Sequence, residues 1–329
     1  MTEPYPWQAA LWQQLARRER HAHAYLLHGP AGIGKRAFAE RLAALLLCAR
    51  PAALTPCGQC KSCQLLRAGS HPDCFDLQPE EADKPIRVDQ VRELVTFVTQ
   101  TAQLGGRKLV LLEPAEAMNL NAANALLKSL EEPSGETVLL LVSHQPSRLL
   151  PTIRSRCLQQ ACPQPAPAEA EAWLAARLPE QEATERRRLL ALAAGSPLRA
   201  LQLHEEGVPA QRLQVEEGVK KLLKQQVAVA ELAESWKAIA LPLLLDWFCL
   251  WAQQLLRVQL AGADALEDDD SMARVIAYLA ERTPLPRVLE LQDWLLAERQ
   301  KVLGKANLNR SLLLEALLVR WLNLPGSRQ

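Results

Sequence analysis

The stretch HGPAGIGKR, from His28 to Arg36, decides the fold of the first half of the chain. Its glycines and lysine have the spacing of a phosphate-binding loop, in which backbone N–H groups and a helix N-terminus surround phosphate oxygens. A short apolar run (25–27) precedes the loop and a helical stretch (36–47) follows it, which favours a phosphate loop over a plain glycine turn. The predicted nucleotide-binding residues are Gly29, Gly32, Gly34 and Lys35.

The last position of this loop departs from that of a working NTPase. Such a loop places Ser or Thr after the lysine, because the hydroxyl is a ligand of magnesium, whereas here Arg36 follows. Glu113 ends an apolar run as a magnesium-organising acid should, but Pro114 stands in the next position and cannot orient water. Glu116 lies further on and reads as a solvated carboxylate at a helix start. These departures indicate that the loop holds ATP, if at all, without hydrolysing it.

The pattern along the chain predicts an α/β domain followed by helical ones. Apolar runs at 109–112 and 138–142 join the run at 25–27 as candidate buried parallel strands. The proline-rich segment PQPAPAEAEAW, which begins at Pro163, marks a domain boundary, and proline and glycine breaks at 195–200 and 205–210 mark another. The predicted domains are 1–165, 166–207 and 208–329.

The C-terminal part has the periodicity of amphipathic helices. In SLLLEALLVRW, apolar side chains recur at i, i+3, i+4 and i+7, namely at Leu314, Leu317, Leu318 and Trp321. We expect the helices from about Val208 onward to make oligomer contacts, because their amphipathic stretches offer more apolar surface than one small bundle needs.

A group of closely spaced cysteines predicts a metal site. Three of them follow the pattern C-x2-C-x2-C, and a fourth lies at the end of the preceding helical stretch. Four thiolates give the closed tetrahedral site of a structural zinc, with an iron–sulfur cluster and packed free thiols as the alternatives. The predicted zinc ligands are Cys48, Cys57, Cys60 and Cys63. The other cysteines lack ligand spacing and are predicted to be buried thiols: Cys74, Cys157, Cys162 and Cys249.

Composition limits the remaining possibilities. The 38 Lys and Arg residues nearly balance the 37 Asp and Glu residues, which argues against a broad basic face for nucleic acid. Apolar runs such as 247–252 are too short to span a membrane, and MTEPYPWQ has no secretory signal pattern. The expected location is the cytoplasm.

Polar residues after the third predicted strand suggest phosphate chemistry. Ser143 and His144 stand where a side chain senses a γ-phosphate, or where a strand end is simply capped. Arg154 and Arg156 flank Ser155, and arginine stabilises transferring phosphoryl charge, including charge in a neighbouring protein.

Together, these segments resemble the delta prime family of bacterial DNA polymerase III clamp-loader subunits. The resemblance covers nearly the whole chain and is carried by YPWQ (5–8), HAYLLHGPAGIGK, the cysteine insertion, NAANALLKSLEEP (121–133), LLPTIRSRC and NLNRSLLLEALLVRW. It implies an α/β P-loop (AAA+) domain with a zinc-knuckle insertion, an all-α lid and an all-α collar that assembles subunits into an open ring.

The resemblance also implies roles. Arg156 would be the arginine finger that acts in trans on the ATP site of the adjacent motor subunit. The partners would be the gamma/tau and delta subunits and, indirectly, the sliding clamp and primed DNA. The chain would thus belong to a DNA-directed DNA polymerase holoenzyme, a nucleotidyltransferase complex, without polymerase motifs of its own. In the lid, Leu198 stands where motor subunits have a phosphate-sensing arginine, and Arg199 comes one residue later.

Three other readings remain open on the sequence alone. The chain could be an autonomous P-loop ATPase with tolerated departures. It could be a zinc-containing nucleic-acid module that contacts a backbone through Lys61 and Arg67. It could be a purely structural collar protein, for which Arg156 would be dispensable.

Overall fold

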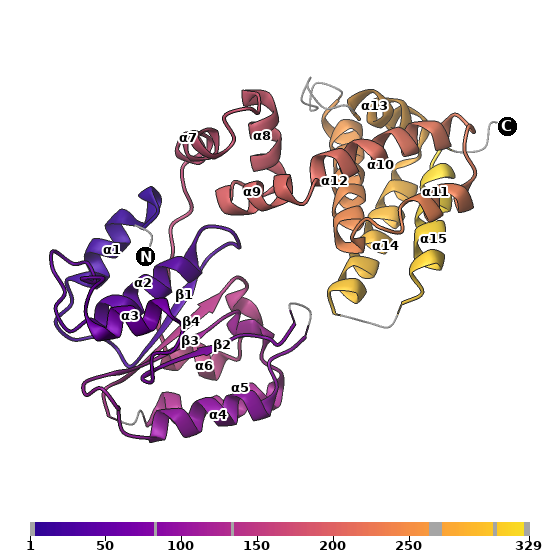
Figure 1. Ribbon diagram of the computed structural model, residues 1–329. Helices are drawn as coiled ribbons and strands as arrows, with labels where there is room; N and C mark the ends of the chain where they lie inside the picture. The colour runs from indigo at the N-terminus through magenta and orange to yellow at the C-terminus, as the bar shows by residue number, and fades with distance from the viewer. Residues whose placement is uncertain (1–3, 82–83, 133–134, 263–271, 305–307, 326–329) are drawn as a thin grey trace. The chain divides into compact units, whose positions relative to one another are not determined.

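The computed structural model describes residues 4–81, 84–132, 135–262, 272–304 and 308–325 (Figure 1). The chain divides into two compact units, Met1–Glu206 and Gly207–Gln329. Pro133 and Asn307, at the ends of two of the motifs above, lie outside the described residues.

The first unit is built on a parallel five-stranded sheet with the strand order β2-β3-β4-β1-β5. The strands are β1 (Ala24–His28), β2 (Cys74–Leu77), β3 (Lys108–Leu112), β4 (Thr137–Ser143) and β5 (Leu158–Ala161). In the register of the sheet, His28 at the end of β1 lies beside Ser143 of β4 and Ala161 of β5. Because parallel strands end at a common edge, the loop after β1 meets the residues that follow β3 and β4.

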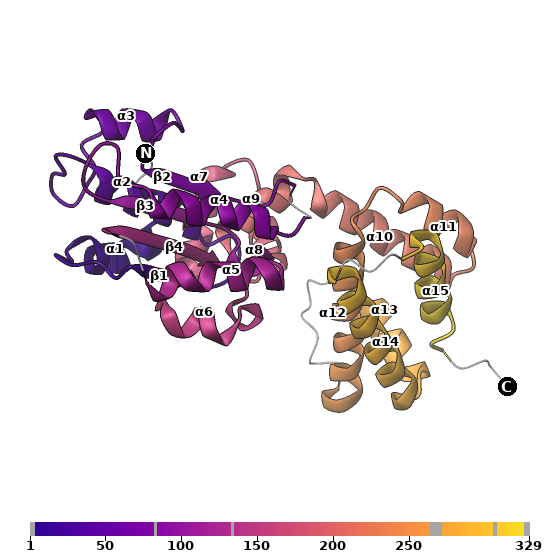
Figure 2. The same ribbon diagram turned by 90° about the horizontal axis from the view of Figure 1, so that it is seen from below.

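Helices cover both faces of this sheet, as Figures 1 and 2 show. On one face, α1 (Ala9–Ala16) and α2 (Lys35–Leu47) pack against strand residues such as Tyr25 and Leu27. On the other face, α4 (Val88–Thr99), α5 (Leu120–Glu131) and α6 (Pro151–Arg156) pack against residues such as Leu26. Successive strand residues point to opposite faces, so central strands with continuous apolar runs fill both cores. The short helix α3 (Lys61–Arg67) belongs to the cysteine-bearing insertion between α2 and β2.

Three helices complete the first unit. They are α7 (Pro167–Arg177), α8 (Ala183–Leu192) and α9 (Pro197–Glu205), and they pack against one another. The prolines that were read as a boundary stand just before α7 and at its first position, where a helix tolerates proline. The ring of Trp173 in α7 meets Tyr5 and Trp7 edge-on, each at 5.9 Å between ring centroids.

The second unit is helical in its described residues. It contains α10 (Val208–Leu223), α11 (Val229–Ser235), α12 (Leu241–Ala261), α13 (Ala273–Arg282), α14 (Leu285–Leu303) and α15 (Arg310–Leu322). The predicted apolar positions Leu314, Leu317, Leu318 and Trp321 are all fully buried on α15. The ring of Trp321 packs edge-on against Phe248 at 5.0 Å, and Asn309 caps α15 by accepting the N–H of Leu312. None of the helices that the structure describes is both long and apolar enough to cross a membrane.

Candidate functional site at the phosphate loop, the arginine helix and the cysteine cluster

The phosphate loop connects β1 to α2, and its lysine binds the loop itself. Gly29, Gly32 and Gly34 have φ values of 149°, 76° and 85°, which side-chain-bearing residues rarely adopt. The Lys35 ammonium donates to the carbonyl oxygen of Gly29 at 2.7 Å and also to that of Pro30. Lys35 is 2% exposed, and burial lowers the pKa of its ammonium to about 8. The charge that would meet a phosphate is therefore directed at backbone oxygens of its own loop.

The N-terminal segment covers one side of the loop. The Tyr5 ring lies so close to Gly34 that a β carbon added there would stand 2.3 Å from it. Tyr5 stacks on Trp7 at 5.0 Å, and the Trp7 indole and the Gln8 amide both donate to the carbonyl of Ile33 at 2.9 Å. These contacts fix the aromatic segment on the loop.

Helix α9 covers another part of the loop. The backbone N–H of Leu198 donates to the carbonyl of Gly32 at 3.1 Å, and a β carbon added at Gly32 would stand 2.5 Å from that of Arg199. The Arg199 guanidinium lies 3.7 Å from the carboxylate of Glu206. The backbone of Arg199 therefore lies against the loop while its charge is paired elsewhere.

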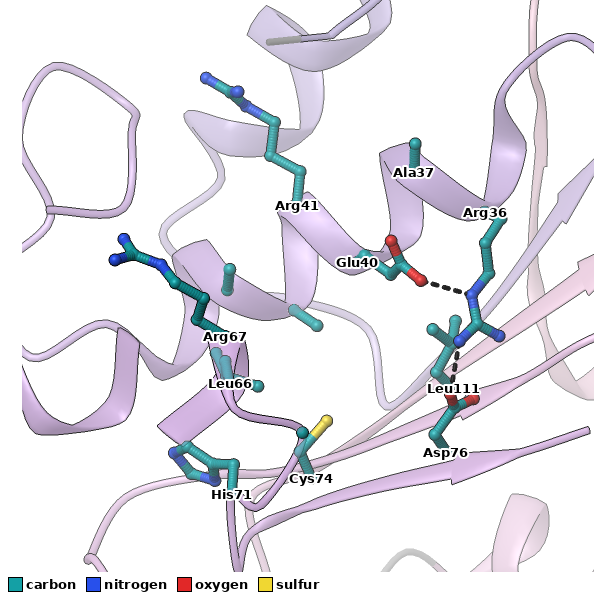
Figure 3. A pocket seen from close by; sticks show the side chains of 13 residues that line it. Arg36, Ala37, Glu40, Arg41, Leu66, Arg67, His71, Cys74, Asp76 and Leu111 are labelled. Atoms are coloured by element: carbon teal, nitrogen blue, oxygen red, sulfur yellow. Dashed lines mark hydrogen bonds and ion pairs between the residues drawn. The ribbon is translucent and has the colours of Figure 1, made fainter. Parts of the chain in front are cut away.

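Arg36 is surrounded by acids at the start of α2, as Figure 3 shows for two of them. Its guanidinium pairs with Glu40 at 2.6 Å, with Asp76 in β2, and with Glu113 at 3.6 Å. Burial disfavours the guanidinium charge, but the hydrogen bonds to Asp76 and Glu40 outweigh this effect and raise the pKa of Arg36.

The two acids after β3 have different surroundings. Glu113 is mostly buried, lies 3.8 Å from the His144 imidazole, and has a pKa raised by burial even though Arg36 and Lys35 oppose the shift. Glu116 accepts the backbone N–H groups of His144 and Gln145 at 2.8 and 3.0 Å. Glu116 does lie in the first turn of the short 3-10 helix Ala115–Ala117, as expected, but the expectation that it is merely solvated is wrong, since this side chain binds the residues that follow β4.

Ser143 and His144 lie at this same edge of the sheet. Ser143 is fully buried as the last residue of β4. Burial is also the main reason why the pKa of His144 lies below its ordinary value, with the Lys35 charge as the next cause. The structure thus brings the loop, Glu113 and His144 together.

The motifs LEEP and SRC meet through an ion pair. Arg156, the last residue of α6, lies with its guanidinium 2.6 Å from the carboxylate of Glu131, the last residue of α5. Arg156 also donates to the carbonyl of Thr152 at 3.0 Å, and about a third of its side chain is exposed. The guanidinium is therefore held at the surface in a defined position.

The cysteine cluster has the geometry of a metal site. The sulfur atoms of Cys48, Cys57, Cys60 and Cys63 all lie within 4.8 Å of one another, and all four residues are free thiols. A tetrahedral zinc site needs sulfur atoms about 3.8 Å apart, so small movements suffice to close the cluster on an ion. The backbone N–H groups of Cys57 and Cys60 already donate to the sulfurs of Cys48 and Cys57, at 3.2 and 3.3 Å. The donor set fits a thiolate-bound metal.

The other cysteines follow the prediction in most cases. Cys157, Cys162 and Cys249 are buried, and burial raises the pKa of each thiol. Cys74 in β2 is only partly buried, yet burial still raises the pKa of its thiol to about 11.

Sequence reasoning missed the partners of the candidate residues. Glu40 follows Arg36 by one helical turn, a spacing at which opposite charges commonly pair, so it was within reach of prediction. Asp76 and Glu131 pair with residues that are 40 and 25 positions away in the chain, and no local pattern marks them. Tyr5 belongs to the YPWQ motif, but nothing in that motif predicts that its ring lies against Gly34.

This fold and these sites define an AAA+-type P-loop domain with a four-cysteine insertion, joined to helical domains. The chain is 67% identical over 326 residues to the DNA polymerase III subunit delta' of Pseudomonas aeruginosa, covering 99% of both chains. It belongs to the delta prime family of DNA polymerase III clamp-loader subunits, which places it in DNA replication.

A second relative and two family models agree with this family, and one solved structure is also similar in part. The chain is 32% identical to the DNA polymerase III subunit delta' of Escherichia coli over 323 residues, covering 96% of this chain and 94% of that one. Residues 6–165 match the family model "DNA polymerase III, delta subunit", and residues 208–323 match "DNA polymerase III, delta subunit, C terminal". A solved gamma subunit-related protein of Thermotoga maritima aligns over 96% of this chain and 98% of its own, with 20% identity and a TM-score of 0.44.

Proposed function

We propose that this chain supplies Arg156 to the ATP site of a neighbouring motor subunit and hydrolyses no ATP itself. In this role it helps the complex to place a sliding clamp on primed DNA in the cytoplasm. Its direct partners are the gamma/tau and delta subunits.

The position of Arg156 is the observation that carries this proposal. Its guanidinium lies at the end of a surface helix, partly exposed, and is held by Glu131 and the Thr152 carbonyl. An exposed ion pair of this kind contributes about 0–1 kcal/mol, so a triphosphate with more negative charge can displace the carboxylate at small cost. Arginine is suited to this role because its planar fork matches phosphate oxygens.

The contacts within the chain's own phosphate loop support the proposal that the chain hydrolyses no ATP. Hydrolysis needs a lysine on the phosphates, a metal-binding hydroxyl and an acid that positions water. Here Lys35 donates to Gly29 and Pro30, Arg36 replaces the hydroxyl, and Glu116 accepts backbone N–H groups. The Lys35 ammonium could reach a phosphate only after its contacts with Gly29 and Pro30 were broken.

The cysteine cluster completes the proposed function as a structural zinc site. Cys48, Cys57, Cys60 and Cys63 would hold the ion as four thiolates, which leaves no position for a reactive water. Zinc held there would link the end of α2 to α3, and its binding free energy would contribute to the folding of this segment.

The test is ATP hydrolysis by the reconstituted clamp loader with clamp and primed DNA. We expect Arg156→Ala to lower ATP turnover by about 10²-fold or more at the one ATP site that this arginine completes. The turnover of the whole complex should fall by the fraction that this site contributes. The chain alone should be inactive. Arg148→Ala, a change at an exposed arginine just before α6, is the matched control and should leave turnover unchanged.

Two results would contradict the proposal. Steady hydrolysis by the isolated chain would make it an autonomous ATPase. Normal turnover in a complex that contains Arg156→Ala, with assembly shown to be complete, would reduce the chain to a structural subunit.

A further inference from the structure

The surroundings of Arg36 differ from those of an ordinary surface arginine. Each of its three guanidinium nitrogens lies near a different carboxylate: Nε and Nη2 donate hydrogen bonds to Glu40 and Asp76, and Nη1 lies 3.6 Å from Glu113, an ion-pair distance without a hydrogen bond. The three acids come from α2, β2 and the residue after β3, so three separate elements converge on one cation. A guanidinium has donors on all three nitrogens, which makes it able to serve three acceptors at once.

The burial of Glu113 indicates that the positive charge of Arg36 stabilises this cluster. The side chain of Glu113 is 15% exposed and that of Arg36 is 24% exposed, whereas Glu40 and Asp76 reach further into solvent. A carboxylate as buried as Glu113 is unfavourable unless a cation stands beside it. Lys35 donates to the carbonyls of Gly29 and Pro30, so among the described contacts the Lys or Arg side chain that forms an ion pair with Glu113 is Arg36.

The position in the loop identifies what Arg36 replaces. It occupies the sequence position of the hydroxyl that binds magnesium, and Glu113 occupies that of the acid that organises the same ion. In a hydrolysing loop, a divalent cation therefore sits between these two positions. Here a guanidinium sits between them.

We propose that Arg36 is a permanent, covalently attached substitute for the divalent cation of the loop. Its guanidinium offsets one of the three negative charges of Glu113, Asp76 and Glu40 and lies beside all three, so that the domain holds this site together with neither metal nor nucleotide bound. The acids themselves remain suitable ligands for a small hard cation such as Mg²⁺ or Mn²⁺. Removal of the guanidinium should therefore turn this place into a divalent-cation site. This inference does not depend on Arg156.

The structure offers room for such an ion and a control for the experiment. Arg36, Glu40 and Asp76 line one part of a cavity of about 360 Å³, and Arg67 lines another part (Figure 3). A shorter side chain at position 36 would open space that water and a hydrated cation can fill. Arg67 donates to the carbonyl of Gly58 and pairs with none of the three acids in the described contacts, so Arg67→Thr removes an arginine from the same cavity without exposing the cluster.

The experiment measures Mn²⁺ binding to the full chain by electron paramagnetic resonance, and melting temperature with and without Mn²⁺ or Mg²⁺. Buffers are freed of metal by resin rather than by a soluble chelator, because a chelator would also attack the cysteine cluster. We expect Arg36→Thr to bind about one Mn²⁺ at least ~10-fold more tightly than the unchanged chain. Its melting temperature should fall by about 3 °C or more without metal and recover with Mn²⁺. Arg67→Thr should behave like the unchanged chain.

Further variants keep the proposal open to refutation if Arg36→Thr does not fold. Arg36→Gln removes the charge but keeps the length and a donor, and should gain Mn²⁺ binding, whereas Arg36→Lys keeps the charge and should not. Adding Glu113→Gln to either binding variant should abolish the gain. Equal Mn²⁺ affinity in the unchanged chain and in the charge-removing variants would overturn the proposal, and so would a gain that Glu113→Gln leaves intact.

Discussion

Lys35 shows how the surroundings of a residue decide which atoms its side chain binds. The lysine, the loop glycines and the following helix are all present, so the sequence predicts a phosphate site. In the structure, two carbonyl oxygens of the loop take the place of phosphate as acceptors. These carbonyl contacts depend on the backbone conformation of the loop, against which Tyr5 and α9 pack, and no sequence pattern near position 35 predicts those contacts.

The burial of Lys35 leads to a prediction about pH. Its pKa falls from 10.5 to about 8 on folding, so the unfolded chain binds this proton more tightly and the free energy of unfolding rises from pH 8 to 10.5. Below pH 8 the buried charge costs about 3 kcal/mol. Lys35→Met removes that cost, but it also removes two hydrogen bonds worth about 1 kcal/mol each. The free energy of unfolding should therefore rise by about 1 kcal/mol at pH 7.

Urea unfolding of both proteins at pH 7 and at pH 10 measures this effect. The advantage of the Met variant at pH 7 should disappear at pH 10, where the folded chain carries a neutral Lys35. An advantage of the same size at both pH values would mean that packing, and not charge, separates the two proteins.

At the scale of elements, apolar runs in the sequence predicted the three inner strands of the sheet but not its two edge strands. The runs at 25–27, 109–112 and 138–142 became β1, β3 and β4, each longer by one or two residues. β2 and β5 lie at the two edges of the sheet, where one side of a strand has no neighbour. β5 reads LQQA and is largely exposed, so it carries neither a buried run nor an alternating pattern. Its pairing with β1 is set by the tertiary structure.

The cysteine insertion is the element whose fold should depend most on a ligand. It contains one short helix and a cluster formed mainly by Cys48, Cys60 and Cys63, which is too small a core to hold this segment by itself. We expect Cys63→Ser to lose about one zinc per chain and to make residues 49–67 sensitive to protease, while the sheet stays folded.

Zinc content by atomic absorption and mapping of protease cuts by mass spectrometry measure both effects. Cys249→Ser, a change at a buried thiol of the second unit, is the matched control and should keep the zinc. Full zinc content in Cys63→Ser would remove this residue from the ligand set, and an iron–sulfur cluster would be visible by its absorption spectrum.

At the scale of the whole molecule, the sequence predicted three domains, and the structure resolves two compact units with a division at Glu206 and Gly207. The three-helix segment α7–α9 groups with the sheet domain, because α9 is bonded to the phosphate loop. The second unit exposes apolar side chains along α14 at intervals of four and seven residues, namely Leu285, Leu289, Leu296 and Leu303. Such a stripe on one helix face supports the expectation that this unit makes subunit contacts.

Removal of the second unit tests this expectation. A chain that ends at Gly207 should stay folded and keep its zinc site, because the first unit has its own two apolar cores, but it should no longer enter the clamp-loader complex. Circular dichroism and zinc content check the fold, and size-exclusion chromatography with the partner subunits checks assembly. Assembly of the shortened chain would place the main contacts in the first unit.

The bond between α9 and the loop also bears on whether a single substitution could make this loop hydrolyse ATP. It joins the backbone N–H of Leu198 to the backbone carbonyl of Gly32, so a substitution of the Leu198 side chain removes neither bonded atom, and only a proline at 198 would delete the donor. A hydroxyl introduced at position 36 would leave this bond and the Tyr5 ring where they are. We therefore expect that no single substitution at position 36 makes this loop hydrolyse ATP, because the contacts of α9 and of the N-terminal segment with the loop would persist.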